Sequence, residues 1–246
     1  MNVVAIGAHP DDIELGCAGA LLAHRRAGHE VTLLVMTTGE QGPQGSASRV
    51  AEQEDAAALL GARLFWGGFP DGEVSHDRHT TSAIEAVLDD AAADVVYTHA
   101  PADTHQDHRA TAEATLAAAR RVRRVLCYEA PTSIDFSPTL YVDIAGLVEA
   151  KLDALRAHVS QVLRNGLVDL EAVEAQARSR GFQGRLRHAE AFEARRFLFD
   201  VVPAVEESRT WRGSIAGTEG DVHGSAERVP ANYEETIGLE GVPLAL

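Results

Sequence analysis

The stretch that most constrains this chain is its first, an apolar run over residues 2–8 that ends in His9, Pro10, Asp11 and Asp12. A short apolar run closed by turn residues is typical of a buried strand. Apolar residues resume after Asp12 at helical spacing as far as about residue 27. A strand that ends in an imidazole and two carboxylates is presenting ligands, and we expect those ligands to serve a metal ion.

The rest of the chain repeats this alternation of strand and helix. Further strands are predicted over residues 31–36, 63–66, 94–98, 125–128 and 139–142. Helices are predicted over about 47–60, 84–91, 112–119, 148–162 and 170–177. Because the strands are apolar throughout, the pattern predicts an α/β fold, a Rossmann-like doubly wound, mainly parallel sheet flanked by helices. In such a sheet the active site lies at the C-terminal ends of the strands.

Composition limits the partners and the location. The net charge of −15 argues against a nucleic-acid partner and against docking on an anionic membrane. No apolar run approaches the roughly 20 residues of a membrane span, and we see no signal peptide. Two cysteines outside any Cys-x-x-Cys favour reduced thiols, so we expect a cytoplasmic protein.

Two domains of unequal kind are predicted. Residues 1–203 carry the periodic pattern of the α/β domain, whereas residues 204–246 have no clear period and are rich in Glu, Gly and Ser. We expect this extension to pack on the domain or on a neighbouring subunit, which makes it a candidate arm for a homo-oligomer.

The first polar cluster has two interpretations. His9 and Asp12 are three residues apart with Pro10 between them, so both side chains can turn toward one point, and imidazole with carboxylate suits Zn²⁺. Asp11 then diverges from Asp12 and lies where a base for water is needed. Alternatively, Asp12 caps the helix and Asp11 is a turn residue.

A second polar cluster follows the fourth predicted strand, at residues 103–108. A His-rich turn by itself is typical of a solvated loop. If the strand order reverses between the first and fourth strands, however, the two loops face each other. His9, Asp12 and one of the later histidines then form a three-ligand site with a position left for water, which is the catalytic pattern.

These two clusters resemble a known family. Residues 8–14, Ala-His-Pro-Asp-Asp-Ile-Glu, followed by residues 103–108, Asp-Thr-His-Gln-Asp-His, are similar to the PIG-L/LmbE-type deacetylases. These are zinc-dependent N-deacetylases of N-acetylglucosamine derivatives, bacterial thiol-cofactor and antibiotic pathways included. Residues 38–40, 49–52, 70–72 and 184–192 extend the likeness over about residues 2–200.

The resemblance implies a role for each residue of the first cluster. His9, Asp12 and His108 would hold the metal, and Asp11 would be the general base. The metal would be Zn²⁺, with Fe²⁺ or Ni²⁺ as alternatives, since geometry and availability decide among these ions.

The resemblance also implies supporting roles. His105 would stabilise the oxyanion or donate a proton, with Asp107 orienting it and keeping it charged. Arg49 and Asp71 match positions that hold sugar hydroxyls. The simpler alternatives are a helix-surface salt bridge between Arg49 and Glu52, and a turn at Asp71.

The function implied is hydrolysis of an acetyl group from an N-acetylated amino sugar or a related small-molecule amide. A thiol-conjugate amidase of the same family is an alternative, and a non-catalytic metal-binding module is another. A nucleotide-binding Rossmann domain is disfavoured, because the first loop lacks the Gly-x-Gly-x-x-Gly that cradles a pyrophosphate.

Overall fold

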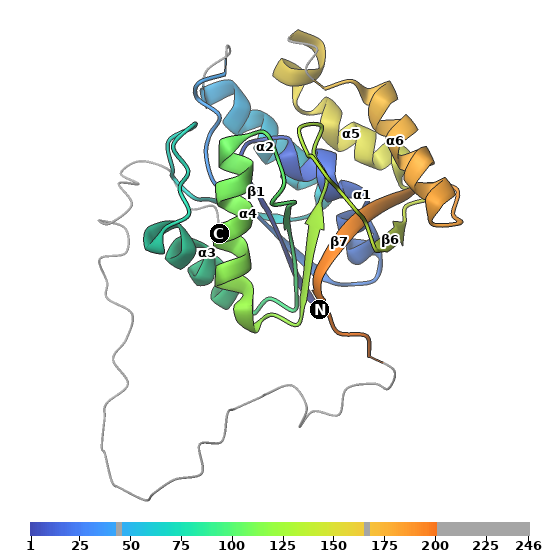
Figure 1. Ribbon diagram of the computed structural model, residues 1–246. Helices are drawn as coiled ribbons and strands as arrows, with labels where there is room; N and C mark the ends of the chain where they lie inside the picture. The colour runs from blue at the N-terminus through green and yellow to red at the C-terminus, as the bar shows by residue number, and fades with distance from the viewer. Residues whose placement is uncertain (43–45, 165–167, 201–246) are drawn as a thin grey trace, which may run out of the picture. The chain divides into compact units, whose positions relative to one another are not determined.

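The computed structural model describes residues 1–42, 46–164 and 168–200, and within them seven strands form one sheet in the order β3-β2-β1-β4-β5-β7-β6 (Figure 1). The strands are β1 (Asn2–Gly7), β2 (Glu30–Val35), β3 (Arg63–Trp66), β4 (Val95–His99), β5 (Arg124–Tyr128), β6 (Leu140–Asp143) and β7 (Ala189–Phe197). The helices are α1 (Asp12–Arg26), α2 (Ser46–Leu60), α3 (Arg78–Asp90), α4 (Gln106–Ala118), α5 (Val148–Arg156) and α6 (Leu170–Gln183), with a 3₁₀ turn at Ala119–Arg121 and a π-helical turn, η2, at Ser160–Arg164.

The strand order reverses between β1 and β4, which is the condition under which the two polar clusters face each other. β1 pairs in parallel with both β2 and β4, β2 continues to β3, and β4 continues to β5. The loops that follow β1 and β4 therefore leave adjacent strands at the same edge of the sheet, on opposite sides of the switch point. The predicted mainly parallel, doubly wound sheet is confirmed.

Two elements differ from the sequence prediction. β7, which was not predicted, runs antiparallel between β5 and β6. Its residues carry three arginine or glutamate side chains in its exposed half, which hides the apolar pattern of a buried strand. The helix predicted over 148–162 ends at Arg156, and the chain turns at the buried His158 before entering η2.

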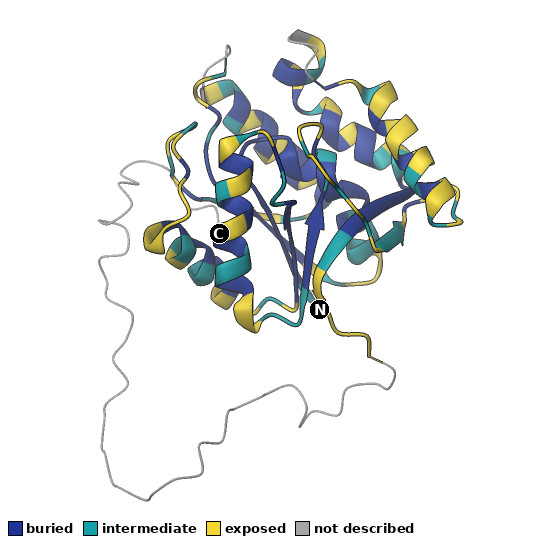
Figure 2. Ribbon diagram, viewed as in Figure 1, coloured by how far each residue is buried: buried dark blue, intermediate teal, exposed yellow. Residues whose placement is uncertain are grey.

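The core lies on both faces of the sheet because side chains alternate along each strand. Along β1, Val3 and Ala5 pack in the cluster that includes α1, whereas Val4 and Ile6 pack in the cluster that includes α3. Figure 2 shows the central strands and the inner helix faces as buried and the outer helix faces as exposed. Burial on both faces fixes the height of the β1 and β4 ends, and so the positions of the loops that follow them.

One compact unit spans Met1–Phe197. The predicted boundary at residue 203 and the predicted extension over 204–246 lie outside the described residues. Among the described helices, none combines the length and the apolar character that a bilayer crossing requires.

Candidate metal centre

The loop after β1 turns back on itself around a carboxylate. The His9 backbone N–H donates to Asp12 Oδ2 at 2.7 Å, and Asp11 between them has a φ of 88°, in the left-handed region. Asp11 stands at the N-cap of α1, but its side chain makes no capping hydrogen bond. Asp11 does lie in a turn, as the alternative expected, whereas Asp12 accepts the His9 backbone N–H and is the first residue of α1.

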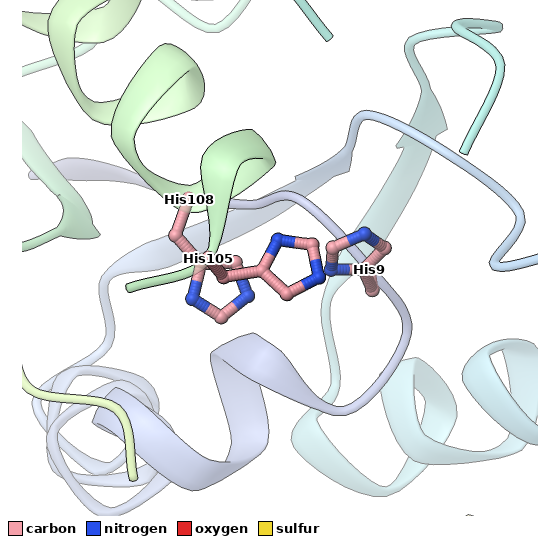
Figure 3. Close-up of side chains that lie close together, drawn as sticks. All are labelled: His9, His105 and His108. Atoms are coloured by element: carbon pink, nitrogen blue, oxygen red, sulfur yellow. The ribbon is translucent and has the colours of Figure 1, made fainter. Parts of the chain in front are cut away.

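The loop after β4 meets it from the other side of the switch point. α4 begins at Gln106, with His105 at the N-cap and His108 in the first turn. Figure 3 shows the His105 and His108 rings, from the start of α4, facing the ring of His9 from the β1 loop. Ring centroids are 4.7 Å apart for His9 and His105 and 4.5 Å apart for His105 and His108.

The three predicted ligands meet at one carboxylate. Asp12 Oδ1 lies 3.3 Å from His108 Nε2, and Asp12 Oδ2 lies 3.3 Å from His9 Nδ1. Within the described residues, three groups place a ligand atom of each member within 4.8 Å of the others: His9, His105 and His108; Asp12, His99 and His108; and His9, Asp71 and Asp107. The predicted trio is divided between the first two groups.

The donor set suits a divalent cation. Burial alone lowers the pKa of His9, but hydrogen bonds to the Asp107 and Asp12 carboxylates raise it to about 12. Burial also lowers the pKa of His108, but the charge of Asp12 and a hydrogen bond to Asp103 raise it to about 9. The carboxylates thus favour the protonated form of each of the two imidazoles. A divalent cation can replace those protons, because metal binding and proton release are linked.

Each predicted histidine ligand is backed by a carboxylate. Asp103 Oδ2 lies 3.2 Å from His108 Nδ1, and the Nε2 of His9 lies 3.1 Å from Asp71 Oδ1 and 3.2 Å from Asp107 Oδ2. Such carboxylate–histidine pairs fix the ring orientation of a metal ligand and raise its basicity. The far nitrogens of both rings are therefore already engaged, and the near nitrogens face Asp12.

The predicted pairing of the Asp107 carboxylate with His105 is wrong. Asp107 Oδ2 accepts the Gly72 backbone N–H at 2.7 Å and lies against His9, because the first turn of α4 directs it across the site. His105 instead accepts the Asp107 backbone N–H at its Nδ1, at 3.2 Å. Burial and the neighbouring His108 lower the pKa of His105, which favours the neutral ring over the charged imidazole that was expected. A neutral ring that accepts at Nδ1 carries its proton on Nε2 and is a hydrogen-bond donor there.

Asp11 is the carboxylate of the loop that no described histidine contacts within ion-pair distance. Its backbone N–H donates to Gln53 Oε1 at 3.2 Å, and its Oδ2 lies 3.6 Å from Arg49 Nη2. Burial and the charge of Asp12 raise the pKa of Asp11 to about 7, against the opposing charges of nearby cations. A carboxylate with a pKa near neutrality is suited to accept and return a proton.

The predicted sugar-binding residues lie at the rim of the cluster. Arg49 is 8% exposed and donates to the carbonyl oxygens of Pro10 at 2.7 Å and Gly39 at 3.4 Å. Asp71 contacts His9 and accepts the Gln41 backbone N–H at 3.1 Å. Their predicted contact with a substrate stays a prediction.

One residue of the site was left aside by the sequence argument. His99, the last residue of β4, is fully buried, and its Nε2 accepts the Ala8 backbone N–H at 3.1 Å and lies 3.2 Å from Asp12 Oδ2. Its ring stacks on His108 at 4.0 Å. The signal was available, because β4 ends beside β1 and its last side chain must reach the same edge.

Comparison with known proteins identifies the family. Residues 4–119 match the PIG-L family, GlcNAc-PI de-N-acetylase. The Escherichia coli K12 protein "Uncharacterized deacetylase YaiS" is 35% identical over 168 residues, which cover 65% of this chain and 91% of that protein. The chain belongs to the PIG-L family.

Solved PIG-L-like structures agree with the fold. The conserved protein TT1542 from Thermus thermophilus is 28% identical and superposes with a TM-score of 0.74, covering 82% of this chain and 97% of that one. The N,N'-diacetylchitobiose deacetylase from Pyrococcus horikoshii is 25% identical with a TM-score of 0.68, covering 78% of this chain and 82% of that one. The PIG-L match at residues 4–119 spans β1 through α4 and therefore contains every predicted site residue.

Proposed function

We propose that this PIG-L chain is a metal-dependent N-deacetylase that removes the acetyl group from an N-acetylated amino sugar or a related small-molecule amide, with Zn²⁺ as its metal. His9, Asp12 and His108 would hold the ion, backed by Asp103 and Asp107. When bound, such an ion polarises the amide carbonyl and makes water more acidic.

The chain's own residues supply the proton transfers. Asp11 accepts a proton from the attacking water and returns it to the amine that leaves. His105 donates a hydrogen bond from Nε2 to the oxygen that becomes negative on the acetyl carbon. A neutral His105 serves this role, because the backbone N–H of Asp107 already occupies its Nδ1 at 3.2 Å.

One observation carries the proposal: a buried carboxylate lies beside the ligand cluster without serving as a cap. Asp11 is 8% exposed, makes no side-chain capping bond, and has a pKa raised to about 7, chiefly by burial. A purely structural metal site has no use for such a base. The deacetylase names of YaiS and of the Pyrococcus horikoshii enzyme support the same reaction class.

The test is an acetate-release assay over a panel of N-acetylglucosamine derivatives: the free sugar, its glycosides and its N-acetylated disaccharides. We expect acetate from at least one of them, loss of release after dipicolinate treatment, and recovery on adding Zn²⁺. Acetate release that survives complete removal of metal would contradict the proposal. Cleavage of thiol-conjugate amides without deacetylation would favour the amidase alternative.

A further inference from the structure

The conformation of Asp11 needs an external support. A non-glycine residue at a φ of 88° lies in a sparsely populated backbone region and persists only where the surroundings hold it. The Asp11 side chain makes no capping hydrogen bond to α1, so a helix cap does not stabilise this conformation. The support has to come from groups that hold the Asp11 backbone.

Gln53 on α2 provides that support. It is completely buried, and its Oε1 accepts the Asp11 N–H at 3.2 Å while its Nε2 donates to Glu14 Oε1 at 2.8 Å. The two contacts fix which end of the amide faces which partner, since only the oxygen accepts and only the nitrogen donates. The orientation of the Gln53 amide toward Asp11 therefore depends on its hydrogen bond to Glu14.

Glu14 is in turn a fully buried carboxylate with one oxygen unmatched. Within the described residues its Oε2 has no hydrogen-bond partner, and His158 Nε2 lies 3.4 Å away from it. His158 is also fully buried, and both its ring nitrogens lack hydrogen-bond partners in that same part of the chain. Two such groups, each costly to bury alone, are compatible with the core only as a pair.

The position of His158 depends on α2 as well. It lies where α5 ends and η2 begins, and Ser160 just beyond it donates its backbone N–H to Glu52 Oε1 at 2.8 Å and its hydroxyl to Glu52 Oε2 at 2.6 Å. Glu52 is the neighbour of Gln53 on α2. Figure 2 shows the inner sides of these helices as buried. Helix α2 therefore contacts the Asp11 backbone through Gln53 and also holds the turn that contains His158 through Glu52.

We propose that Gln53, Glu14 and His158 form a buried positioning network that holds Asp11 in its left-handed conformation, with its carboxylate directed at the reacting water. The inference rests on the proposed function, since it assigns these residues to the base of that reaction. The network reaches the site through the Asp11 backbone N–H, so we assign its members a positioning role. A displacement of the base by about 1 Å is enough to lower a rate up to a hundredfold.

The test compares Gln53→Leu and His158→Gln with a matched control, Glu190→Gln. Glu190 is also buried and bonded to α1, through the Gly19 and Ala20 backbone N–H groups and through Lys151 Nζ, but it does not contact Asp11. We expect the two network variants to lose about tenfold or more in kcat, with KM and metal content unchanged. The control should lose thermal stability and keep kcat.

Two further measurements separate positioning from general destabilisation. Hydrogen exchange in peptides covering residues 8–14 should become about tenfold faster in Gln53→Leu and His158→Gln and stay unchanged in Glu190→Gln. The double variant Glu14→Gln/His158→Gln should recover part of the kcat that His158→Gln loses, because it removes the unpaired carboxylate.

Equal kcat losses in the network variants and the control, or unchanged exchange at residues 8–14, overturn the positioning role. If the wild-type protein releases no acetate from any substrate tested, the proposed function fails. The exchange comparison still decides in that case whether the network holds Asp11.

Discussion

Two of the places where charge is buried among the described residues are built differently. Lys151 and Glu190 join α5 and β7 to α1, with Lys151 Nζ donating to Glu190 Oε1 at 2.6 Å and to the Leu15 carbonyl at 2.7 Å. The two oxygens of Glu190 also accept two backbone N–H groups of α1. This pair is complete in itself, and it needs no further ligand.

The cluster around His9 is not complete in the same sense. One nitrogen, His9 Nε2, faces both Asp71 and Asp107, and Asp107 Oδ1 is buried with no hydrogen-bond partner among the described residues. The carboxylates raise the pKa of both His9 and His108 against the effect of burial. A structural ion pair satisfies its groups with one another, whereas a binding site leaves charge to be satisfied by what it binds. Variants of the Lys151–Glu190 pair should therefore change stability, and variants of the cluster around His9 should change metal binding and hydrolysis.

The largest expected effect is loss of the metal. Removing a ligand by His108→Ala should reduce bound Zn²⁺ from about one per chain to near zero and abolish hydrolysis. Metal per chain by mass spectrometry after dialysis checks it. Glu190→Gln, which alters the complete pair instead, should bind metal like the wild type, and unchanged stoichiometry in His108→Ala would refute the site.

Next comes loss of the base without loss of the metal. Asp11→Asn keeps the size of the side chain but removes its proton affinity, so the turnover rate should fall by about 10²–10⁴ with metal content intact. Steady-state kinetics of the metal-loaded variant provide the measurement. Full activity would show that Asp11 is a turn residue after all.

The complete pair should respond in stability and not in chemistry. Lys151→Met leaves Glu190, 5% exposed, as an uncompensated buried charge, at a cost of about 3–5 kcal/mol in the free energy of unfolding. Urea unfolding followed by circular dichroism gives this value. Hydrolysis per folded molecule should match that of the wild type, and a stable but inactive variant would show that the two regions are not independent.

A smaller effect is expected behind the ligand His108. Asp103→Asn weakens the partner of His108 Nδ1, 3.2 Å away, without removing a ligand, so affinity for Zn²⁺ should fall by about 10–100-fold. Competition with a chromogenic chelator measures that affinity. An affinity equal to that of the wild type would mean that His108 is oriented by α4 alone.

The sequence predicts those features of the site that depend on where the strands end. His9 and one of the later histidines could be assigned to one site because a reversal of strand order places the β1 and β4 loops together, as the parallel β1–β4 pairing confirms. The choice of His108 came from the family resemblance. The partner of Asp107 could not be predicted in this way. Its choice between His9 and His105 depends on how the first turn of α4 sits against another loop, and local spacing carries no information about that.

The same reason explains the residues that were missed. His158 lies in a stretch with continuous helical spacing, so nothing local marks the end of α5 at Arg156 or the buried turn after it. β7 is recognisable only through its neighbours, because antiparallel pairing with β5 and β6 gives its charged half a solvent-exposed place. Tertiary packing decided each of these positions.

The smallest expected effect concerns two histidines, His108 in the site and His24 outside it. His108 faces carboxylates and has a raised pKa, whereas His24 is hydrogen-bonded to the Tyr97 hydroxyl and to His29, each at 2.9 Å, with no carboxylate at hydrogen-bond distance among the described residues. Burial and the neighbouring His29 lower the pKa of His24 from 6.5 to about 4. The folded chain therefore holds this histidine neutral where the unfolded chain would protonate it.

The stability of the folded chain should therefore decrease as the pH falls below 6.5. Because the folded-state pKa of His24 is below the unfolded value, its contribution to stability is complete above pH 6.5 and is lost as the pH falls toward about 4. Between pH 7 and pH 5 the wild type should lose about 2 kcal/mol more stability than His24→Gln, whose amide does not titrate. Urea titrations of both proteins at the two pH values, with the metal removed from each, measure the difference. Equal losses would show that His24 is protonated without cost, and that carboxylates are not what separates the two kinds of histidine in this molecule.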